Sequence, residues 1–175
     1  MTSISQEIRI DAPREKVWNI LADLGGIQRF HPAVSKSYYT TEQKEGVGAG
    51  RVCELLPMGE VVEQASVWQE HEYMKIDIIE GKKTPPFRTA HGSFRLREEN
   101  GQTVVKLTLS YGLKYGPIGR LMDVMMVRSQ FENIVPRMLA GLKHYTETGE
   151  EVTAEVLKRT PQPLQAVSAL QLSVN

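Results

Sequence analysis

The chain has 175 residues, which is long enough for one domain with a sizeable core and is an unusual length for two. Its 21 basic and 21 acidic side chains cancel, so no overall field favours nucleic acid or an anionic membrane surface as a partner. Cys53 is the only cysteine, which excludes an intramolecular disulfide. The first residues lack the basic start and apolar stretch of a leader, and no segment approaches the ~20 apolar residues of a membrane span. We therefore expect a soluble, cytoplasmic protein.

The N-terminal part of the chain predicts one strand followed by two helices. Isoleucines alternate with polar residues up to Ile10, as in a half-buried strand. Residues 11–15 then start a helix, because proline is tolerated in a first turn and acidic groups there complement the helix dipole. Gly25-Gly26 ends this helix, and a short helix or turn covers residues 27–30.

Six further strands separated by turns are predicted from Val34 onward. They cover residues 34–41, 51–56, 61–69, 73–80, 87–98 and 103–115. Asn100-Gly101, before the last of them, is a hairpin signal because both residue types accept a positive φ. The connections are short, so we expect neighbouring strands to pair as an antiparallel meander.

A long amphipathic helix is predicted over residues 117–146. Its apolar residues recur at spacings of three, four and seven: Leu121, Val124, Phe131, Val135, Met138, Leu142 and Tyr145. At about 1.5 Å per residue, such a helix is about 45 Å long and crosses a whole small domain. Pro136 removes the backbone bond to the carbonyl of Glu132, so we expect a kink there that widens the space beneath the helix.

The character of the sequence changes after Gly149. Residues 150–159 can prolong a helix, the Pro-rich residues 160–163 break it, and residues 164–174 are apolar at every second to fourth position. We therefore divide the chain into a domain of residues 1–149 and a C-terminal tail of residues 150–175. The simplest expectation is that the tail docks on its own domain, and docking on another subunit is the alternative.

Four short motifs occur in a characteristic order along the chain. They are residues 10–18 (IDAPREKVW), residues 30–34 (FHPAV) with Ser37, residues 46–51 (GVGAGR) and residues 115–123 (YGPIGRLMD). Together they resemble the START-like or Bet v 1-like superfamily (SRPBCC), in its bacterial branch of polyketide cyclase/dehydrase and lipid transport proteins. The resemblance covers about residues 4–149 and departs at Phe30, where relatives often carry tryptophan.

The resemblance implies an α+β helix-grip fold with the element order β-α-α-β6-α. In this fold a curved antiparallel seven-stranded sheet wraps around a long C-terminal helix and encloses an elongated, mostly apolar cavity. Members of the family include aromatase/cyclases, lipid carriers, hormone receptors and chaperone co-activators, so the function has to be argued from the site.

Polar side chains inside an apolar cavity are the strongest clue to a site, because their burial costs free energy unless a partner or ligand satisfies them. With their apolar neighbours, the predicted ligand-binding residues are His31, Tyr38, Arg51, Glu63, Trp68, Arg88, His91, Leu109, Tyr111, Met125, Arg128 and Phe131. Tyr111 is preferred, since an aromatic ring with one hydroxyl suits an aromatic or carbonyl-bearing ligand.

Alternation along the strands predicts which of these side chains face the cavity. It places Leu109 and Tyr111 on the inner face of residues 103–115. On the preceding strand, strict alternation turns Arg88 inward and His91 outward, and a bulge at Gly92 would reverse this assignment. Both residues are therefore kept as predicted ligand contacts.

Several predicted contacts also have a purely structural interpretation. Arg51 and Glu63 form either an ion pair between adjacent strands, which is the more frequent case, or a ligand contact. His31 either caps its own loop or donates to a ligand. The methionines near Met125 are either ordinary helix packing or an adaptable ligand surface at the cavity mouth. The loops at residues 55–60 and 81–87 are either simple turns or gates.

Established catalytic patterns do not occur in the sequence. The four histidines and Cys53 lack the spacing of metal ligands, so we expect neither a metal nor a cofactor. Cys53 lies within a predicted strand and is expected to be a small buried apolar group rather than a nucleophile.

Three functions from different classes fit these observations. The leading hypothesis is a protein that binds or carries a small hydrophobic ligand of polyketide, lipid or isoprenoid type, oriented by Tyr111 or Arg51. The second is a cyclase or dehydratase in which Tyr111, His31 or Arg88 assists enolisation or dehydration in the same cavity, so the sequence leaves enzyme activity open. The third is a protein-interaction module with an exposed apolar patch. A monomer and a homodimer fit equally well.

Overall fold

The structure of the protein is a computed structural model that describes residues 1–56 and 59–152. The strands are β1 (Thr2–Ile10), β2 (Val34–Tyr39), β3 (Gly50–Leu55), β4 (Gly59–Gln69), β5 (Tyr73–Lys82), β6 (Phe87–Glu99) and β7 (Gln102–Leu113). The helices are α1 (Arg14–Ala22), the 3-10 helix η1 (Leu24–Arg29), α2 (Gly116–Met122), the π-helical turn η2 (Asp123–Val127) and α3 (Arg128–Thr148). The six predicted strands from Val34 onward agree with these bounds to within two residues.

The strands form one antiparallel sheet in the spatial order β1-β7-β6-β5-β4-β3-β2. From β2 to β7 each strand pairs with its neighbour in sequence, which confirms the predicted meander. The first strand closes the sheet by pairing with the last, with Thr2 opposite Tyr111 and Ile10 opposite Thr103. Asn100 and Gly101 have φ values of 53° and 77°, as the predicted hairpin between β6 and β7 requires.

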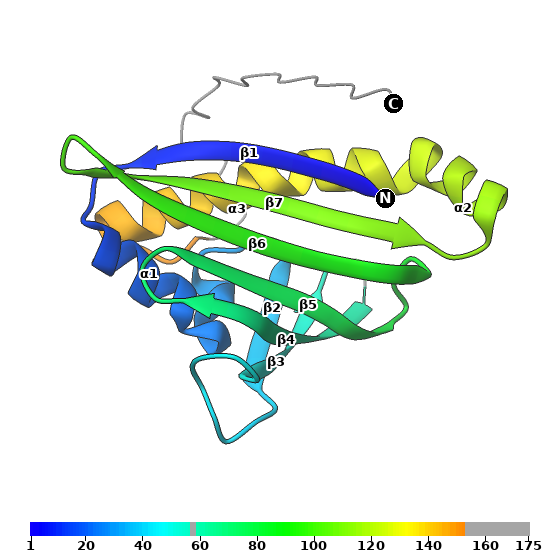
Figure 1. Cartoon of the computed structure of the whole chain (residues 1–175), viewed down its shortest axis with the longest axis horizontal. Coiled ribbons are helices and arrows are strands. Elements are labelled where there is room, and N and C mark those ends of the chain that lie inside the picture. The colour runs from blue at the N-terminus through cyan, green and yellow to red at the C-terminus, as the bar shows by residue number, and fades with distance from the viewer. Residues whose placement is uncertain (57–58, 153–175) are drawn as a thin grey trace.

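The core lies between the sheet and α3, which runs across one face of it (Figure 1). Burial along β1 alternates, and its inner residues meet the inner residues of β7, such as Ile4 with Leu109. From α3, Val135, Leu139 and Leu142 are buried against the strands. These layers confirm the predicted helix-grip arrangement of one long helix held against a curved antiparallel sheet.

The C-terminal helical segment is not one continuous α-helix, which corrects the prediction for residues 117–146. The π-helical turn η2 separates α2 from α3, and the predicted core residues Leu121 and Val124 are exposed. A π turn holds extra residues, so it rotates the helix face before the turn relative to the face after it. In addition, α2 lies past the end of β7, where no strand is available to cover it (Figure 1).

The remaining predictions for the C-terminal part have different outcomes. Phe131 and Tyr145 are half-buried, whereas Met138 and Leu142 are buried as predicted. The helix α3 continues through Pro136 from Arg128 to Thr148, and the kink stays a prediction. Of the predicted tail, residues 150–175, only residues 150–152 are described: Val152 is buried, and its N–H donates to the carbonyl oxygen of Arg29 over 2.8 Å. Docking of residues 153–175 lies outside the described residues.

Gly141 allows α3 to approach the chain that follows η1. An added Cβ would lie 2.1 Å from the carbonyl oxygen of Phe30, a backbone atom that cannot move without displacing its segment. We therefore expect Gly141→Ala to lower the free energy of unfolding by about 1–3 kcal/mol, although alanine favours a helix by about 1 kcal/mol.

Chemical denaturation measures this effect, with Gly92→Ala as the matched control. An added Cβ at Gly92 meets only the flexible end of Leu109, at 3.2 Å. Equal stability of the Gly141→Ala variant and the native protein would contradict the predicted clash.

Candidate functional site

A small aromatic cluster lies on the inner face of the sheet, at the end next to α2 and η2. The rings of Tyr111 and Phe131 have centroids 4.9 Å apart, and Phe87 stands 5.9 Å from Tyr111 and 6.1 Å from Phe131. Tyr111 comes from β7, Phe87 from the start of β6 and Phe131 from α3. Phe87 and Phe131 are only partly buried, so this end of the inner face is less completely packed than the main core.

The hydroxyl of Tyr111 belongs to a polar group of three residues. It donates to Oδ1 of Asp123 over 2.5 Å, and the hydroxyl of Thr2 donates to Oδ2 of the same carboxylate over 2.7 Å. Asp123 is the first residue of η2, so the π turn directs its carboxylate towards the strand ends. Burial and the bond to Asp123 both raise the pKa of Tyr111. Tyr111 is therefore a protonated hydrogen-bond donor at neutral pH.

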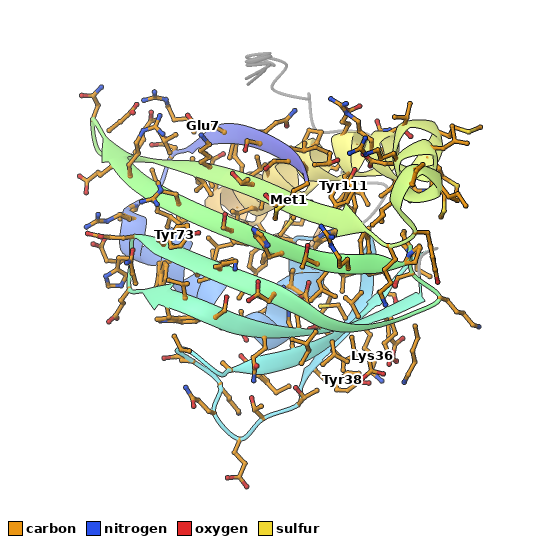
Figure 2. All side chains as sticks on the ribbon, turned by 45° about the vertical axis from the view of Figure 1, so that its right-hand side comes forward. Met1, Glu7, Lys36, Tyr38, Tyr73 and Tyr111 are labelled. Atoms are coloured by element: carbon orange, nitrogen blue, oxygen red, sulfur yellow. The ribbon has the colours of Figure 1, made fainter. Side chains whose placement is uncertain are left out.

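A pocket of about 290 Å³ opens beside this group, between the end of β7, the start of β1 and α2. Tyr111 and Asp123 line it together with three cationic residues, Arg88, Lys114 and Arg120. Met1 also lines the pocket, and Figure 2 shows it close to Tyr111 at the adjoining ends of β1 and β7. The pocket thus combines hydrogen-bonding groups, positive charge and an aromatic neighbour.

A second polar cluster lies deeper, between η1 and strands β2, β3 and β4. Arg51 and Glu63 face each other on β3 and β4, and Nε of the arginine donates to Oε2 of the glutamate over 2.7 Å. Nη1 of Arg51 also donates to the carbonyl oxygen of Leu24 over 3.0 Å. The arginine side chain is 6 % exposed and the glutamate side chain 17 % exposed. The predicted ion pair between strands is confirmed, and it ties η1 to the sheet.

His31 is buried next to this cluster. Its Nδ1 accepts a hydrogen bond from the backbone N–H of Ala33 over 3.1 Å, which confirms the loop-capping interpretation. Burial, and secondarily the positive charge of Arg51, lower the pKa of His31 to about 4. The imidazole is therefore neutral at physiological pH.

Cys53 is the third member of the deep cluster. Its thiol is buried and lies 3.6 Å from Oε2 of Glu63 and 3.7 Å from the hydroxyl of Ser37. Burial raises the pKa of the thiol to about 12, so the thiolate that a nucleophile needs does not form near neutral pH. The predicted buried position of Cys53 is confirmed.

Comparison with protein families gives a match over most of the chain. The model described as polyketide cyclase/dehydrase and lipid transport covers residues 1–147. The chain belongs to this family. A comparison with curated proteins finds no match.

Solved structures show the same fold as this member of the polyketide cyclase/dehydrase and lipid transport family. The protein TTHA0849 from Thermus thermophilus is similar with a TM-score of 0.70 and 23% identity, over 85% of this chain and 99% of its own. Ara h 8.0201 is similar with a TM-score of 0.67 and 13% identity, over 84% of this chain and 98% of its own. The di-domain ARO/CYC BexL from the BE-7585A biosynthetic pathway is similar with a TM-score of 0.64 and 17% identity, over 84% of this chain and 47% of its own.

The family and the helix-grip fold support the binding of a small hydrophobic ligand. Among the predicted contacts, the structure brings Tyr111 and Phe131 together at one end of the inner face, with Leu109 next along β7, and Arg88 lies on the exposed side of the same sheet end, next to Gly112. The bulge in β6 lies between Phe87 and Thr89 rather than at Gly92. The exposed Arg88 therefore lines the pocket at the strand end instead of entering the core. The role of these residues in binding stays a prediction.

Tyr38 and His91 lie on the outer face of the sheet, away from the other predicted contacts. Tyr38 pairs with Val52 on β3 and is exposed, with the ammonium of Lys36 5.5 Å from its ring (Figure 2). His91 lies opposite Asp77 on β5, so the outward orientation from strict alternation is the one observed. These positions follow from alternation, because each neighbouring residue faces inward.

Three other predicted contacts also lie apart from the pocket. Trp68 faces inward but packs edge-on against Trp18, with ring centroids 5.3 Å apart. Arg128 pairs with Glu132 on the exposed side of the helix, with 3.0 Å between Nε and Oε1. Met125 is exposed on η2, which places it outside the inner face.

The residues that sequence reasoning missed are Thr2, Lys114, Arg120 and Asp123. An acidic residue among the apolar residues of the predicted long helix was the available signal for Asp123. Among the described residues, no group of three or more His, Cys, Asp or Glu side chains is placed to hold a metal ion. No helix in the described part of the chain is long and apolar enough to cross a membrane.

Proposed function

We propose that the protein binds a small amphiphilic ligand, with an apolar body and a carboxylate end, at the α2 end of the inner face. One observation carries this proposal: a pocket of about 290 Å³ lined by three cationic side chains lies next to the partly buried aromatic cluster. Ligand sites in proteins combine an apolar lining with a few oriented polar groups in this manner.

The apolar body of the ligand packs against inner-face residues that the protein itself leaves partly uncovered. These are Ile78 on β5, Leu109 and Leu113 on β7, and Phe131 on α3. Each square ångström of apolar surface removed from water contributes about 25 cal/mol. Binding therefore completes the packing of this end of the core.

The carboxylate end of the ligand lies between Arg88, Lys114 and Arg120. Asp123 is the acidic residue of the pocket lining, and both of its carboxylate oxygens accept hydrogen bonds from hydroxyls. The pocket lining thus holds three cations and one carboxylate, so the pocket favours an anion. Tyr111 supplies its ring to the apolar wall and holds Asp123 in place.

The same geometry weighs against Tyr111 as an acid in a cyclase or dehydratase. A general acid works best when its pKa lies near the operating pH. Burial and the Asp123 carboxylate raise the pKa of Tyr111 instead. We therefore favour binding over turnover as the function of this pocket.

The proposal is tested by competition of decanoate with a fluorescent fatty acid probe on the full chain. We expect decanoate to bind and Leu109→Trp to weaken its affinity by at least about tenfold, because the larger indole takes the place that the apolar body of the ligand is proposed to occupy. Lys106→Trp is the matched control, since Lys106 is exposed on the outer face of the same strand. Absence of decanoate binding, or equal affinities in the two variants, would contradict the proposal.

The carboxylate part of the proposal has a separate readout. The double variant Lys114→Ala/Arg120→Ala is expected to weaken decanoate by about tenfold and to leave decanol unchanged, because only the acid carries a charge. Equal losses of affinity for decanoate and for decanol would show that the two cations affect the fold of the pocket and do not recognise the carboxylate.

A further inference from the structure

The segment that follows the pocket carries an unusual apolar surface. The large side chains of the α2–η2 apolar face are between 53% and 74% exposed, and they are Ile118, Leu121, Val124, Met125 and Met126. By contrast, Gly119 and Val127 in the same segment are buried. Several large apolar side chains exposed on one short segment indicate an interaction site, because exposing them to water is unfavourable.

The charges around the α2–η2 apolar face are mainly positive, although the whole chain is neutral. Residues 114–128 hold Lys114, Arg120 and Arg128 against a single acidic residue, Asp123. Asp123 is engaged with Tyr111 and Thr2, and Arg128 pairs with Glu132. None of the ion pairs formed by the described residues involves Lys114 or Arg120. The chain is therefore neutral as a whole but carries a local excess of cations at this surface.

The α2–η2 apolar face also lies at an accessible extremity of the molecule. In Figure 1, α2 projects past the tip of β7 at the end of the sheet, away from α1 and from strands β3 and β4. Lys114, Gly119 and Arg120 line the pocket, so this surface adjoins the pocket opening. A partner can therefore reach these side chains without meeting the β3 and β4 side of the domain.

We infer that the α2–η2 apolar face docks on an anionic lipid surface. The exposed isoleucine, leucine, valine and methionine side chains enter the boundary of the hydrocarbon layer, and Lys114 and Arg120 meet the lipid phosphates. The inference rests on the proposed function, because docking serves a protein whose pocket binds a hydrophobic ligand. The ligand then passes between the lipid layer and the adjoining pocket without crossing water. The lipid phosphates are thus the partners of Lys114 and Arg120, and the zero net charge of the chain does not predict this contact.

The first test is co-sedimentation of the full chain with vesicles. We expect at least about tenfold stronger binding to phosphatidylcholine vesicles that contain phosphatidylglycerol than to pure phosphatidylcholine vesicles, and a loss of this difference at high salt. Equal binding to both vesicle types, or binding to neither, would overturn the inference.

The second test separates the apolar face from the pocket. Leu121→Ser/Val124→Ser is expected to weaken binding to the mixed vesicles by at least about tenfold, because it removes apolar surface from the contact. Ile79→Ser is the matched control, since Ile79 is 60% exposed on β5, and it is expected to leave vesicle binding unchanged.

Neither Leu121 nor Val124 lines the pocket, so their double variant should bind decanoate in solution as the native chain does. Loss of vesicle binding with decanoate binding retained supports the lipid surface. If the native chain did not bind decanoate, the proposed function would be overturned. If the double variant bound the mixed vesicles as strongly as the native chain does, only the docking inference would be overturned.

The third test identifies a different occupant of the face. Under hydroxyl-radical oxidation, Met125 and Met126 should react rapidly in solution and become protected by the mixed vesicles, while Met74, which is 1% exposed, reacts slowly throughout. Protection of Met125 and Met126 without vesicles, or a dimer by light scattering, would show that another segment or a second copy covers the face and would overturn the inference.

Discussion

Replacing Glu63 by glutamine should lower the free energy of unfolding by about 3–5 kcal/mol, because a buried charge that loses its partner is strongly destabilising. The guanidinium of Arg51 remains buried and fixed by its bond to the carbonyl oxygen of Leu24. Glutamine keeps the shape of the side chain and one acceptor oxygen but removes the countercharge. Urea denaturation of the native chain and the variant measures the difference.

Two variants show whether burial of the pair causes this loss. Glu99→Gln removes the partner of Arg9 and Arg97 in an exposed network of ion pairs and should cost much less stability than Glu63→Gln. Arg51→Met/Glu63→Leu removes both buried charges and should recover much of the stability, since Ser37 still donates to the carbonyl oxygen of Leu24. If Glu63→Gln cost no more than Glu99→Gln, the pair would not act as a buried one.

Acidification from pH 6.5 to about 4 should reduce stability by about 3 kcal/mol through His31, because the pKa of this residue falls from 6.5 to about 4 on folding. In this interval the unfolded chain binds a proton at His31 that the folded chain does not. The contribution of His31 to stability is therefore complete above pH 6.5 and is lost as the pH falls towards 4. Urea denaturation at several pH values measures the slope.

The His31→Asn variant isolates this contribution. Asparagine can cap the N–H two residues later as the imidazole does at Ala33, but it does not titrate. The pKa of His91 is also lowered, and the lowered pKa values of Glu7, Asp77 and Glu99 add losses at lower pH, so the comparison between the two chains is needed. Parallel curves for the native chain and the variant between pH 6.5 and about 4 would contradict the role of His31.

The sheet is predictable from the sequence because its signals are local. Side chains alternate along a strand, so the inward positions of Leu109 and Tyr111 follow from one strand alone. Positive φ at Asn100 and Gly101 is likewise a property of those two residues. The π turn η2 has no such signal, because the apolar period of Leu121, Val124 and Phe131 runs through it unchanged.

The candidate site is less predictable because its contacts join distant parts of the chain. Thr2 and Asp123 are separated by 121 positions, and their hydrogen bond exists only because β1 pairs with β7. The pocket cations Lys114 and Arg120 flank a turn whose direction depends on Tyr115, which has a φ of 70° that non-glycine residues rarely adopt. Neither the pairing of distant strands nor this turn can be read from periodicity.

The pairing of the first strand with the last governs when the pocket arises during synthesis. Thr2 leaves the ribosome roughly 110 residues before its partner Tyr111, and at about 5–20 residues per second this is an interval of about 5–20 seconds. During that time the inner isoleucines of β1 have no strand beside them, and the long loop makes their pairing a slow, late event. Because Thr2 and Tyr111 both line the pocket, only a chain that has completed this last step possesses a binding site.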